Sequence, residues 1–226
     1  MTDENEAVIL SAARTPIGKF QGSLSGVAAT KLGAIAIQAA VDRAGIDPKD
    51  IEEVIMGNVV QAGEGQAPAR QSGIYSGIPA TVSATTVNKV CGSGLKAAMM
   101  SAQAVRAGDA DLFVAGGFES MSRAPYLVNG RMGELKFGNV QMTDALLNDG
   151  LFDPFENWGM GNAAEFIGEE LPGVTFPSGL NAGLSFDRAS SDVSLRGPSS
   201  VSTTKTSPLR PAIWTGTISG LNFPAS

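Results

Sequence analysis

The feature that most constrains the fold is an alternation of strand and helix patterns over the first 171 residues. Apolar strand patterns cover residues 7–13, 53–60, 81–87 and 112–115, and helical patterns cover 30–44, 67–75 and 91–107. Gly45 and Gly108 follow two of the helical patterns and can end them. Strands that alternate with helices of this length are typical of a parallel or mixed sheet with helices on both faces. We therefore predict an α/β fold.

Three segments depart from a simple alternation. The helix over residues 91–107 is rich in Gly, Ala and Ser, which predicts burial between layers. Residues 121–161 are rich in glycine and predict a loop-rich excursion, a common place for a binding surface. From residue 172 to 226, Ser, Thr, Pro and Gly make up 29 of 55 residues, and no helical or alternating period persists. This composition predicts a disordered tail, with a small folded module as the alternative.

The composition excludes several classes of protein. A net charge of -6 argues against binding to nucleic acid or an anionic membrane. A single cysteine cannot form an internal disulfide. No apolar run approaches the roughly 18 residues of a membrane span, and the acidic N-terminus resembles neither a signal nor a transit peptide. We therefore expect a cytoplasmic location.

The absence of histidine limits the chemistry available to these 226 residues. Histidine is the side chain whose ordinary pKa lies nearest neutrality. A general base would have to be a shifted carboxylate, lysine or cysteine, or come from elsewhere. Without histidine or paired cysteines, no metal-ligand cluster is expected either.

The segment Asn88-Lys89-Val90-Cys91-Gly92-Ser93-Gly94 carries the main chemical signal. It places Cys91 between a predicted strand and the start of a predicted helix, where free N–H groups and the helix dipole favour a thiolate. The neighbouring glycines allow a tight turn and the approach of an acyl group. A buried, inert cysteine is the other interpretation of the same pattern. The spacing alone leaves both open.

Several longer motifs resemble the thiolase family. NKVCGSGLKA at residues 88–97 resembles the thiolase nucleophile motif, and further similarities follow in the same order along the chain. They are VILSAARTPIGKFQGSLS at 8–25, VIMGNVVQAGEGQAPARQ at 54–71, FVAGGFESMSRAPY at 113–126 and ENWGMGNAAE at 156–165. The resemblance implies a thiolase N-terminal domain over residues 6–171, in which 120–161 forms part of a loop region that covers coenzyme A.

The resemblance also implies an activity, that of an acyl-CoA C-acyltransferase of the acetyl-CoA C-acetyltransferase type. Cys91 would accept an acyl group from acyl-CoA as a thioester, and a second acyl-CoA would condense with it. Leu151 and Met160 match positions that line the pantetheine pocket in the family, although core packing is the alternative role for both. Coenzyme A thioesters are the expected substrates, with no cofactor. Thiolases are typically dimers or tetramers, so a homo-oligomer is expected.

The chain also departs from the family pattern. Thiolases have a second half with NEAF-like, GHP and CGGG segments, which supply an oxyanion hole, the activating His and a second Cys, and none of these is present. Gly159-Met160-Gly161 stands where the family commonly has His-Met-Gly. The similarity ends near Leu171, and the residues beyond it are typical of a tail read out of frame. We therefore expect little thiolase turnover from this chain alone.

Two alternatives to a thiolase-type acyltransferase remain. A β-ketoacyl-synthase-like condensing enzyme would share the fold and the cysteine at the start of a helix. A non-catalytic fragment could bind acyl-CoA or form oligomers through its exposed sheet, near residues 81–87. The acyl chain length and the direction of the reaction are not encoded in any motif found.

Overall fold

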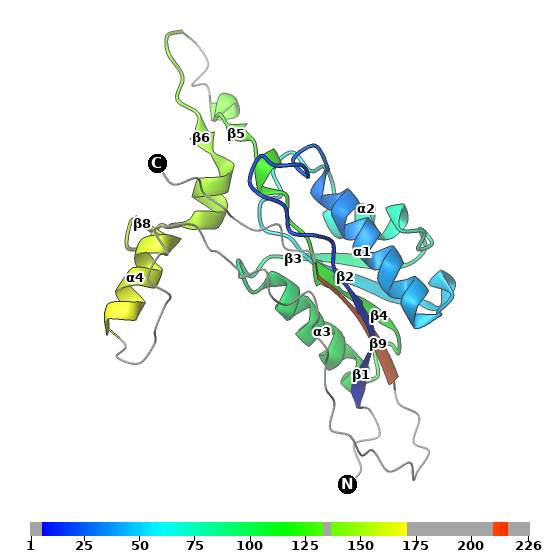
Figure 1. Cartoon of the computed structure of the whole chain (residues 1–226). Helices are drawn as coiled ribbons and strands as arrows, with labels where there is room; N and C mark the ends of the chain where they lie inside the picture. Colours follow the sequence, from blue (N-terminus) through cyan, green and yellow to red (C-terminus); the bar gives the residue numbers. More distant parts are fainter. Residues whose placement is uncertain (1–5, 133–136, 171–209, 217–226) are drawn as a thin grey trace.

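The computed structural model describes residues 6–132, 137–170 and 210–216 (Figure 1). Five parallel strands form the main sheet, in the order β1-β9-β4-β2-β3. Their bounds are Ala7–Ala13 (β1), Glu53–Gly57 (β2), Ser83–Val87 (β3), Phe113–Gly117 (β4) and Arg210–Gly216 (β9). The prediction of an α/β fold is confirmed. Among the described residues, antiparallel pairing occurs in two small separate sheets and not in this one.

Helices cover both faces of the sheet (Figure 1). Helices α1 (Ala29–Ala44) and α2 (Pro68–Tyr75) lie on one face, and α3 (Ser93–Ala107) lies on the other. Side chains alternate along a strand, so Val54 and Met56 of β2 pack towards α1 and α2 while Ile55 packs towards α3. As predicted, Gly45 and Gly108 end α1 and α3 in left-handed conformation. A short helical turn, η1 (Pro48–Asp50), precedes β2.

The predicted burial of α3 between two layers is not observed among the described residues. Its buried side chains are Ser93, Ala97, Ser101 and Val105, which recur every four residues and therefore form one stripe. On the opposite face, Leu95 is 66% exposed and Met99 is 48% exposed. One face of α3 is thus covered by the sheet, and the other is open.

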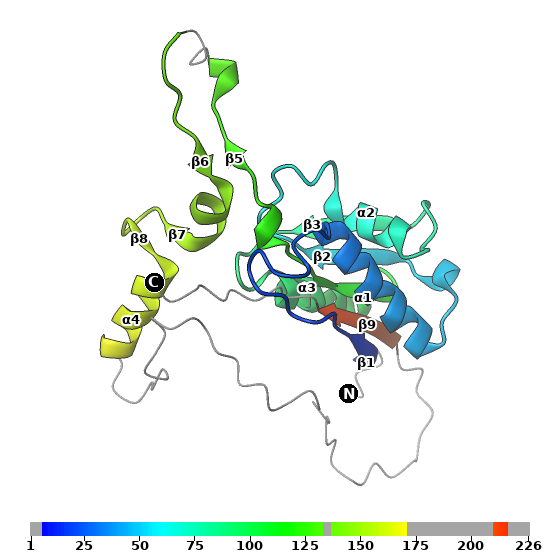
Figure 2. The ribbon, with the colours of Figure 1, turned by 45° about the horizontal axis from the view of Figure 1, so that its top comes forward.

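Residues 121–170, here called the arm, extend away from the α/β body formed by residues 7–120 and β9 (Figure 2). The arm consists of short elements: η2 (Met121–Arg123), β5 (Tyr126–Leu127), η3 (Gly130–Met132), β6 (Thr143–Asp144), η4 (Leu147–Leu151), β7 (Phe152–Asp153), β8 (Trp158–Gly159) and α4 (Met160–Glu170). The predicted loop-rich excursion is therefore observed. Helix α4 was not anticipated from the sequence.

Strand β9 corrects one prediction about the tail. The sequence predicted no regular structure between residues 172 and 226, yet Arg210–Gly216 lies between β1 and β4 and pairs with both. A strand draws its backbone hydrogen bonds from distant segments, so local composition is a weak guide to it. The rest of the predicted tail lies outside the described residues.

Candidate active site

Cys91 lies in a tight turn between the end of β3 and the start of α3. Its side chain is exposed. The preceding residue, Val90, has a φ angle of 46°, a left-handed conformation that is unfavourable for a β-branched side chain. Outliers of this kind persist where surrounding contacts enforce them, and they concentrate at functional sites. The backbone strain next to Cys91 therefore marks this turn as the candidate active site.

Side chains of Asn88 and Ser93 hold the strained turn. The Val90 N–H donates to Oδ1 of Asn88 at 2.9 Å. The Oγ of Ser93 accepts from the Lys89 N–H at 2.8 Å and donates to the Val90 carbonyl at 2.6 Å. Because the buried Ser93 is also the first residue of α3, it joins the turn directly to the helix.

The predicted start of this helix was wrong by two residues. The helical pattern was taken to begin at Cys91, whereas α3 begins at Ser93 and Gly92 is its N-cap. The left-handed Val90 reverses the chain, so that helical geometry starts only after the turn. Cys91 thus precedes the first turn of α3.

Three glycines bring the start of α3 into contact with the ends of the strands. A Cβ atom at Gly57, the last residue of β2, would lie 2.5 Å from the carbonyl carbon of Ser93. A Cβ atom at Gly117, which ends β4, would lie 3.2 Å from Cα of Gly94. Only hydrogen fits at Gly57 without movement of the backbone. The Cys91 turn is therefore held at the carboxyl edge of a parallel sheet, where α/β proteins commonly bind ligands.

A half-buried carboxylate lies at the same edge. Glu119, which follows β4, accepts hydrogen bonds from the N–H groups of Val59 at 2.8 Å and Val60 at 3.3 Å. It also accepts from Nδ2 of Asn58 at 3.0 Å. Burial raises the pKa of Glu119, and the two backbone hydrogen bonds oppose this shift. The carboxylate thereby fixes the backbone that leaves β2.

Glu64 lies near Glu119 in the loop between β2 and α2. Its pKa is raised to about 7, first by burial and second by the negative charge of Glu119. A hydrogen bond from Asn58 and the charge of Arg123 act in the opposite direction. Glu64 can therefore hold a proton near neutral pH, which few carboxyl groups can do.

Leu151 and Met160 belong to the arm rather than to the Cys91 turn. Leu151 is half-buried at the end of η4 and packs against a cluster that includes Val60 and Leu146. Because Val60 lies three residues beyond the end of β2, Leu151 lies on the side of the body that carries the carboxylates. Met160 is half-buried and begins α4, next to β8. The predicted pantetheine-lining role of both residues stays a prediction.

Comparison with known proteins identifies the family. A model described as the N-terminal domain of thiolase matches residues 7–172, which is most of the chain. The chain belongs to the thiolase family. This confirms the resemblance found in the nucleophile motif and in the longer motifs around it.

The relatives of this thiolase chain are acetyl-CoA acetyltransferases. The enzyme of Cupriavidus necator is 50% identical over 175 residues, a match that covers 77% of this chain and 44% of the relative. The enzyme of Schizosaccharomyces pombe is 52% identical over 165 residues, covering 73% of this chain and 42% of the relative. In each case the thiolase chain spans less than half the length of the relative.

A solved thiolase shares the fold. The crystal structure of Acat5 thiolase from Ascaris suum in complex with coenzyme A is 46% identical to this chain, with a TM-score of 0.68. The match covers 72% of this chain and 42% of that structure.

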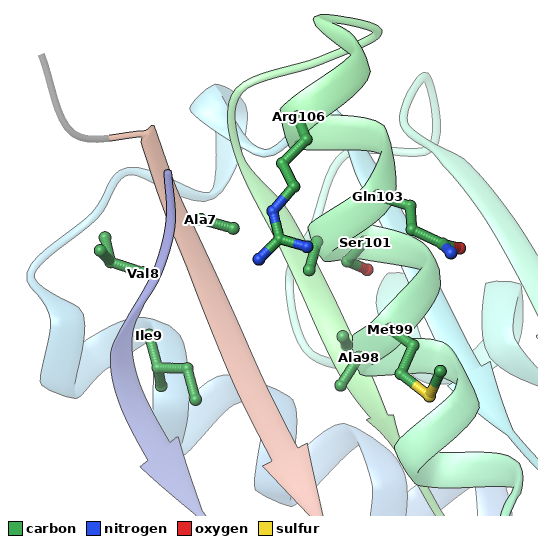
Figure 3. A pocket seen from close by; sticks show the side chains of 10 residues that line it. Ala7, Val8, Ile9, Ala98, Met99, Ser101, Gln103 and Arg106 are labelled. Atoms are coloured by element: carbon green, nitrogen blue, oxygen red, sulfur yellow. The ribbon is translucent and has the colours of Figure 1, made fainter. Parts of the chain in front are cut away.

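One hollow of the thiolase chain lies apart from Cys91. It has a volume of about 410 Å³ and lies between β1 and α3 (Figure 3). Its lining is mostly apolar, with Ile9 on one side and Met99 on the other. Ser101, Gln103 and Arg106 add polar groups from α3. Among the described residues that line the hollow, Arg106 is the one titratable side chain, so we assign no catalytic role to the hollow.

Two searches of the described part of the thiolase chain were negative. Among residues 6–132, 137–170 and 210–216, no group of three or more His, Cys, Asp or Glu side chains could hold a metal ion. No helix in the same residues has the length and apolar character needed to cross a membrane.

The sequence motif identified Cys91 and the neighbouring glycines. It did not indicate the strain at Val90 or the hydrogen bonds of Asn88 and Ser93. A signal for Asn88 was available, because Asn often accepts a hydrogen bond from the N–H two residues later. No comparable signal exists for Glu64 and Glu119, since 55 positions separate them and only the fold brings them together.

Proposed function

We propose that this chain carries the acyl-accepting nucleophile of a thiolase-type acyltransferase, of the acetyl-CoA C-acetyltransferase type. The observation that carries the proposal is the position of Cys91. It is exposed, it follows the strained Val90, and it lies where three parallel strands end. The names of the relatives support acyl-CoA as the class of substrate.

The first step is transfer of the acyl group to Cys91. The thiolate attacks the carbonyl carbon of the acyl-CoA thioester, and a new carbon–sulfur bond forms to Sγ. The bond from that carbon to the sulfur of coenzyme A breaks, and coenzyme A leaves as a thiolate that takes up a proton. Gly92 has no Cβ atom, which leaves space for the acyl group beside Sγ.

The second step forms a carbon–carbon bond. The α-carbon of a second acyl-CoA loses a proton and attacks the carbonyl carbon of the Cys91 thioester. The thiolate of Cys91 leaves, and the product is a 3-ketoacyl-CoA; thiolysis is the reverse reaction. The 226 residues contain no histidine and no second cysteine to remove this proton. We therefore propose that this chain alone performs acylation with little turnover, because loss of a general base costs about 10²–10⁴ in rate.

In this proposal the arm covers coenzyme A. Leu151 and Met160 would contact the pantetheine, with Leu151 placed by its packing against Val60 beyond the end of β2. Exposed apolar side chains elsewhere in the arm, such as Phe155 and Met142, give it a surface able to bind an apolar ligand.

Mass spectrometry of the intact chain after incubation with acetyl-CoA tests the proposal. The expected result is the addition of one acetyl group, located on Cys91 by peptide mapping and removable by hydroxylamine. The Cys91→Ala variant should remain unmodified. Acetylation of lysine alone, or none at all, would contradict the proposal. If coenzyme A binds by calorimetry without acylation of Cys91, the chain is a non-catalytic binding protein instead.

The edge strand β3 supports a homo-oligomer as part of the same proposal. β3 lies at one edge of the five-stranded sheet and pairs there with β2. Its second edge can accept another strand, and two copies of the chain could pair in this way. Sedimentation equilibrium should give a mass of at least two chains. A monomer at micromolar concentration would contradict this part of the proposal.

We further propose a cytoplasmic location, which suits a chain whose single cysteine cannot form an internal disulfide. Some relatives carry the word mitochondrial in their names, such as that of Xenopus tropicalis. If the proposal is correct, a fusion of this chain to a fluorescent protein should show a diffuse cytoplasmic signal. Retention in an organelle would contradict the assignment.

A further inference from the structure

A continuous set of contacts connects the half-buried carboxylate of Glu119 to the turn that holds Cys91. Glu119 accepts hydrogen bonds from the backbone N–H groups of Val59 and Val60. The carbonyl of Val59 accepts from Nδ2 of Asn88 at 3.4 Å. On the other side of the same amide, Oδ1 of Asn88 accepts from the N–H of Val90 at 2.9 Å.

The hydrogen bond from the Val90 N–H to Asn88 keeps the backbone of the turn in its strained conformation. Val90 is held at a φ angle of 46°, which its branched side chain disfavours. The hydrogen bond from its N–H fixes Asn88, and the contact between Asn88 and Val59 fixes Asn88 relative to the sheet. Movement of the backbone at Val59 would therefore be transmitted to Val90 and to Cys91 beside it.

Glu64 adds a proton to this set of contacts. Its Oε2 atom and Oδ1 of Asn58 are both buried, and neither has a hydrogen-bond partner among the residues that the structure describes. Asn58 is 1% exposed. While Glu64 is ionised, both atoms can only accept hydrogen bonds, and a proton on Glu64 turns one of its own oxygens into a donor.

We propose that Glu119 is a positioning residue for Cys91, acting through Val59 and Asn88, and that the proton on Glu64 determines how firmly these contacts hold. The proposal rests on the proposed function, because positioning matters only if Cys91 reacts. With Glu64 protonated, Glu119 is the one negative charge of the pair, and it binds the backbone N–H groups of Val59 and Val60. With both ionised, repulsion and an unsatisfied buried carboxylate act against the same geometry.

Three neighbouring segments place charged or polar groups around Glu64. Glu119 follows β4 and raises the pKa of Glu64, whereas Arg123 of η2 lowers it. From α2, the neutral Gln71 donates through Nε2 to the backbone carbonyl of Glu64 at 2.9 Å. Because the pKa of Glu64 is raised to about 7, Glu64 gains or loses its proton in the physiological pH range.

The test is the pH dependence of the alkylation rate of Cys91 by iodoacetamide, from pH 5.5 to 9. Cys91 is the single cysteine, so thiol loss reports on it alone. The unmodified chain should show an inflection near pH 7 in addition to that of the thiol itself. Glu64→Gln, which stays neutral, should lose this inflection and react faster than the unmodified chain above pH 7. We expect these two rates to differ by about tenfold, which corresponds to a change of about 1.4 kcal/mol in the activation free energy.

Two further variants separate positioning from general loss of structure. Glu119→Gln should lower the rate at every pH and also remove the inflection near pH 7. Glu52→Gln is the matched control, because the Glu52 carboxylate also accepts two backbone N–H groups, those of Asp111 and Leu112, but at the amino end of β4. Glu52→Gln should keep the pH profile of the unmodified chain. Circular dichroism identifies any variant that is unfolded.

Two results would overturn the inference. One is a Glu64→Gln profile that superimposes on that of the unmodified chain after scaling. The other is a Glu52→Gln variant that loses the inflection as fully as Glu119→Gln. The outcome is independent of acyl transfer: if acetyl-CoA fails to acylate Cys91, the proposed function fails, while the iodoacetamide profiles still decide the role of Glu64 and Glu119.

Discussion

Phe113 and Phe155 have the same side chain in opposite surroundings. Phe113 on β4 is 1% exposed within the α/β body, while Phe155 in the arm is 91% exposed. The contrast extends to their neighbourhoods. The body has two clusters of buried apolar side chains, one on each face of its sheet. The arm shares one small cluster with the body, around Ala145 and Leu146, and its strands are two residues long. Most of the cooperative stability therefore comes from the body, and the exposed part of the arm can serve as a contact surface.

The largest effect should come from Phe113→Ala. Removal of a fully buried aromatic side chain loses its transfer free energy and leaves a cavity, which together cost about 3–5 kcal/mol. Denaturant unfolding followed by circular dichroism measures the loss. A loss below about 1 kcal/mol would show that β4 is not part of the cooperative core.

The next largest effect is expected for Gly57→Ala. The new Cβ would lie 2.5 Å from the Ser93 backbone, so α3 must shift away from β2, at a cost of about 1–3 kcal/mol. The same shift should slow the alkylation of Cys91. The arm offers a matched control in Gly161→Ala, because Gly161 lies in α4 with no atom within 4 Å of its added Cβ. That change should stabilise α4 by about 0.5–1 kcal/mol.

A smaller effect should follow from Glu64→Gln, and it depends on pH. The pKa of Glu64 is about 7 in the folded chain against 4.5 ordinarily, so the folded state binds an extra proton between these values. The free energy of unfolding should therefore fall as pH rises from 4.5 to 7 and then level off. Because Glu64 is partly solvated, we expect a total of about 1 kcal/mol. Glu64→Gln should remove this slope, whereas Glu165→Gln on the exposed surface of α4 should leave it intact.

The smallest effect should come from Phe155→Ala. An exposed side chain outside any packed cluster contributes within about 0.5 kcal/mol of zero. The free energy of unfolding should therefore stay unchanged. If the arm covers coenzyme A, the variant should bind this ligand more weakly, as measured by calorimetry. A large loss of stability would instead show that the arm folds as part of the body.

The body was largely predictable from the sequence, because the signals for its strands and helices lie in the local sequence. The strand over residues 7–13 was predicted with its observed ends, and α1 begins one residue before its predicted start. In both cases the pattern of apolar residues lies within the segment itself, and Gly45 directly follows α1. The arm shows the opposite case. The sequence of α4 follows a glycine-rich segment, and no helix was predicted for it.

The candidate site likewise has a part that could be predicted from the sequence and a part that could not. Cys91 could be identified because its neighbours in the sequence are also its neighbours in space. The roles of Glu64 and Glu119 could not, because they depend on the meeting of three segments at the carboxyl edge of the sheet: the loop after β2, the end of β4 and η2. Residues that act through long-range contacts leave little trace in a local pattern.

The position of β9 has a consequence for how the molecule folds. In the sheet, β1 pairs with β9, and Ala7 lies opposite Arg210. During synthesis, β2, β3 and β4 emerge early and can associate, but β1 must wait on the ribosome until Arg210–Gly216 is made. A pairing between such distant positions raises the contact order and slows folding. Until then the edges of β1 and β4 are open, and this interval is when the nascent chain is most exposed to aggregation and most dependent on chaperones.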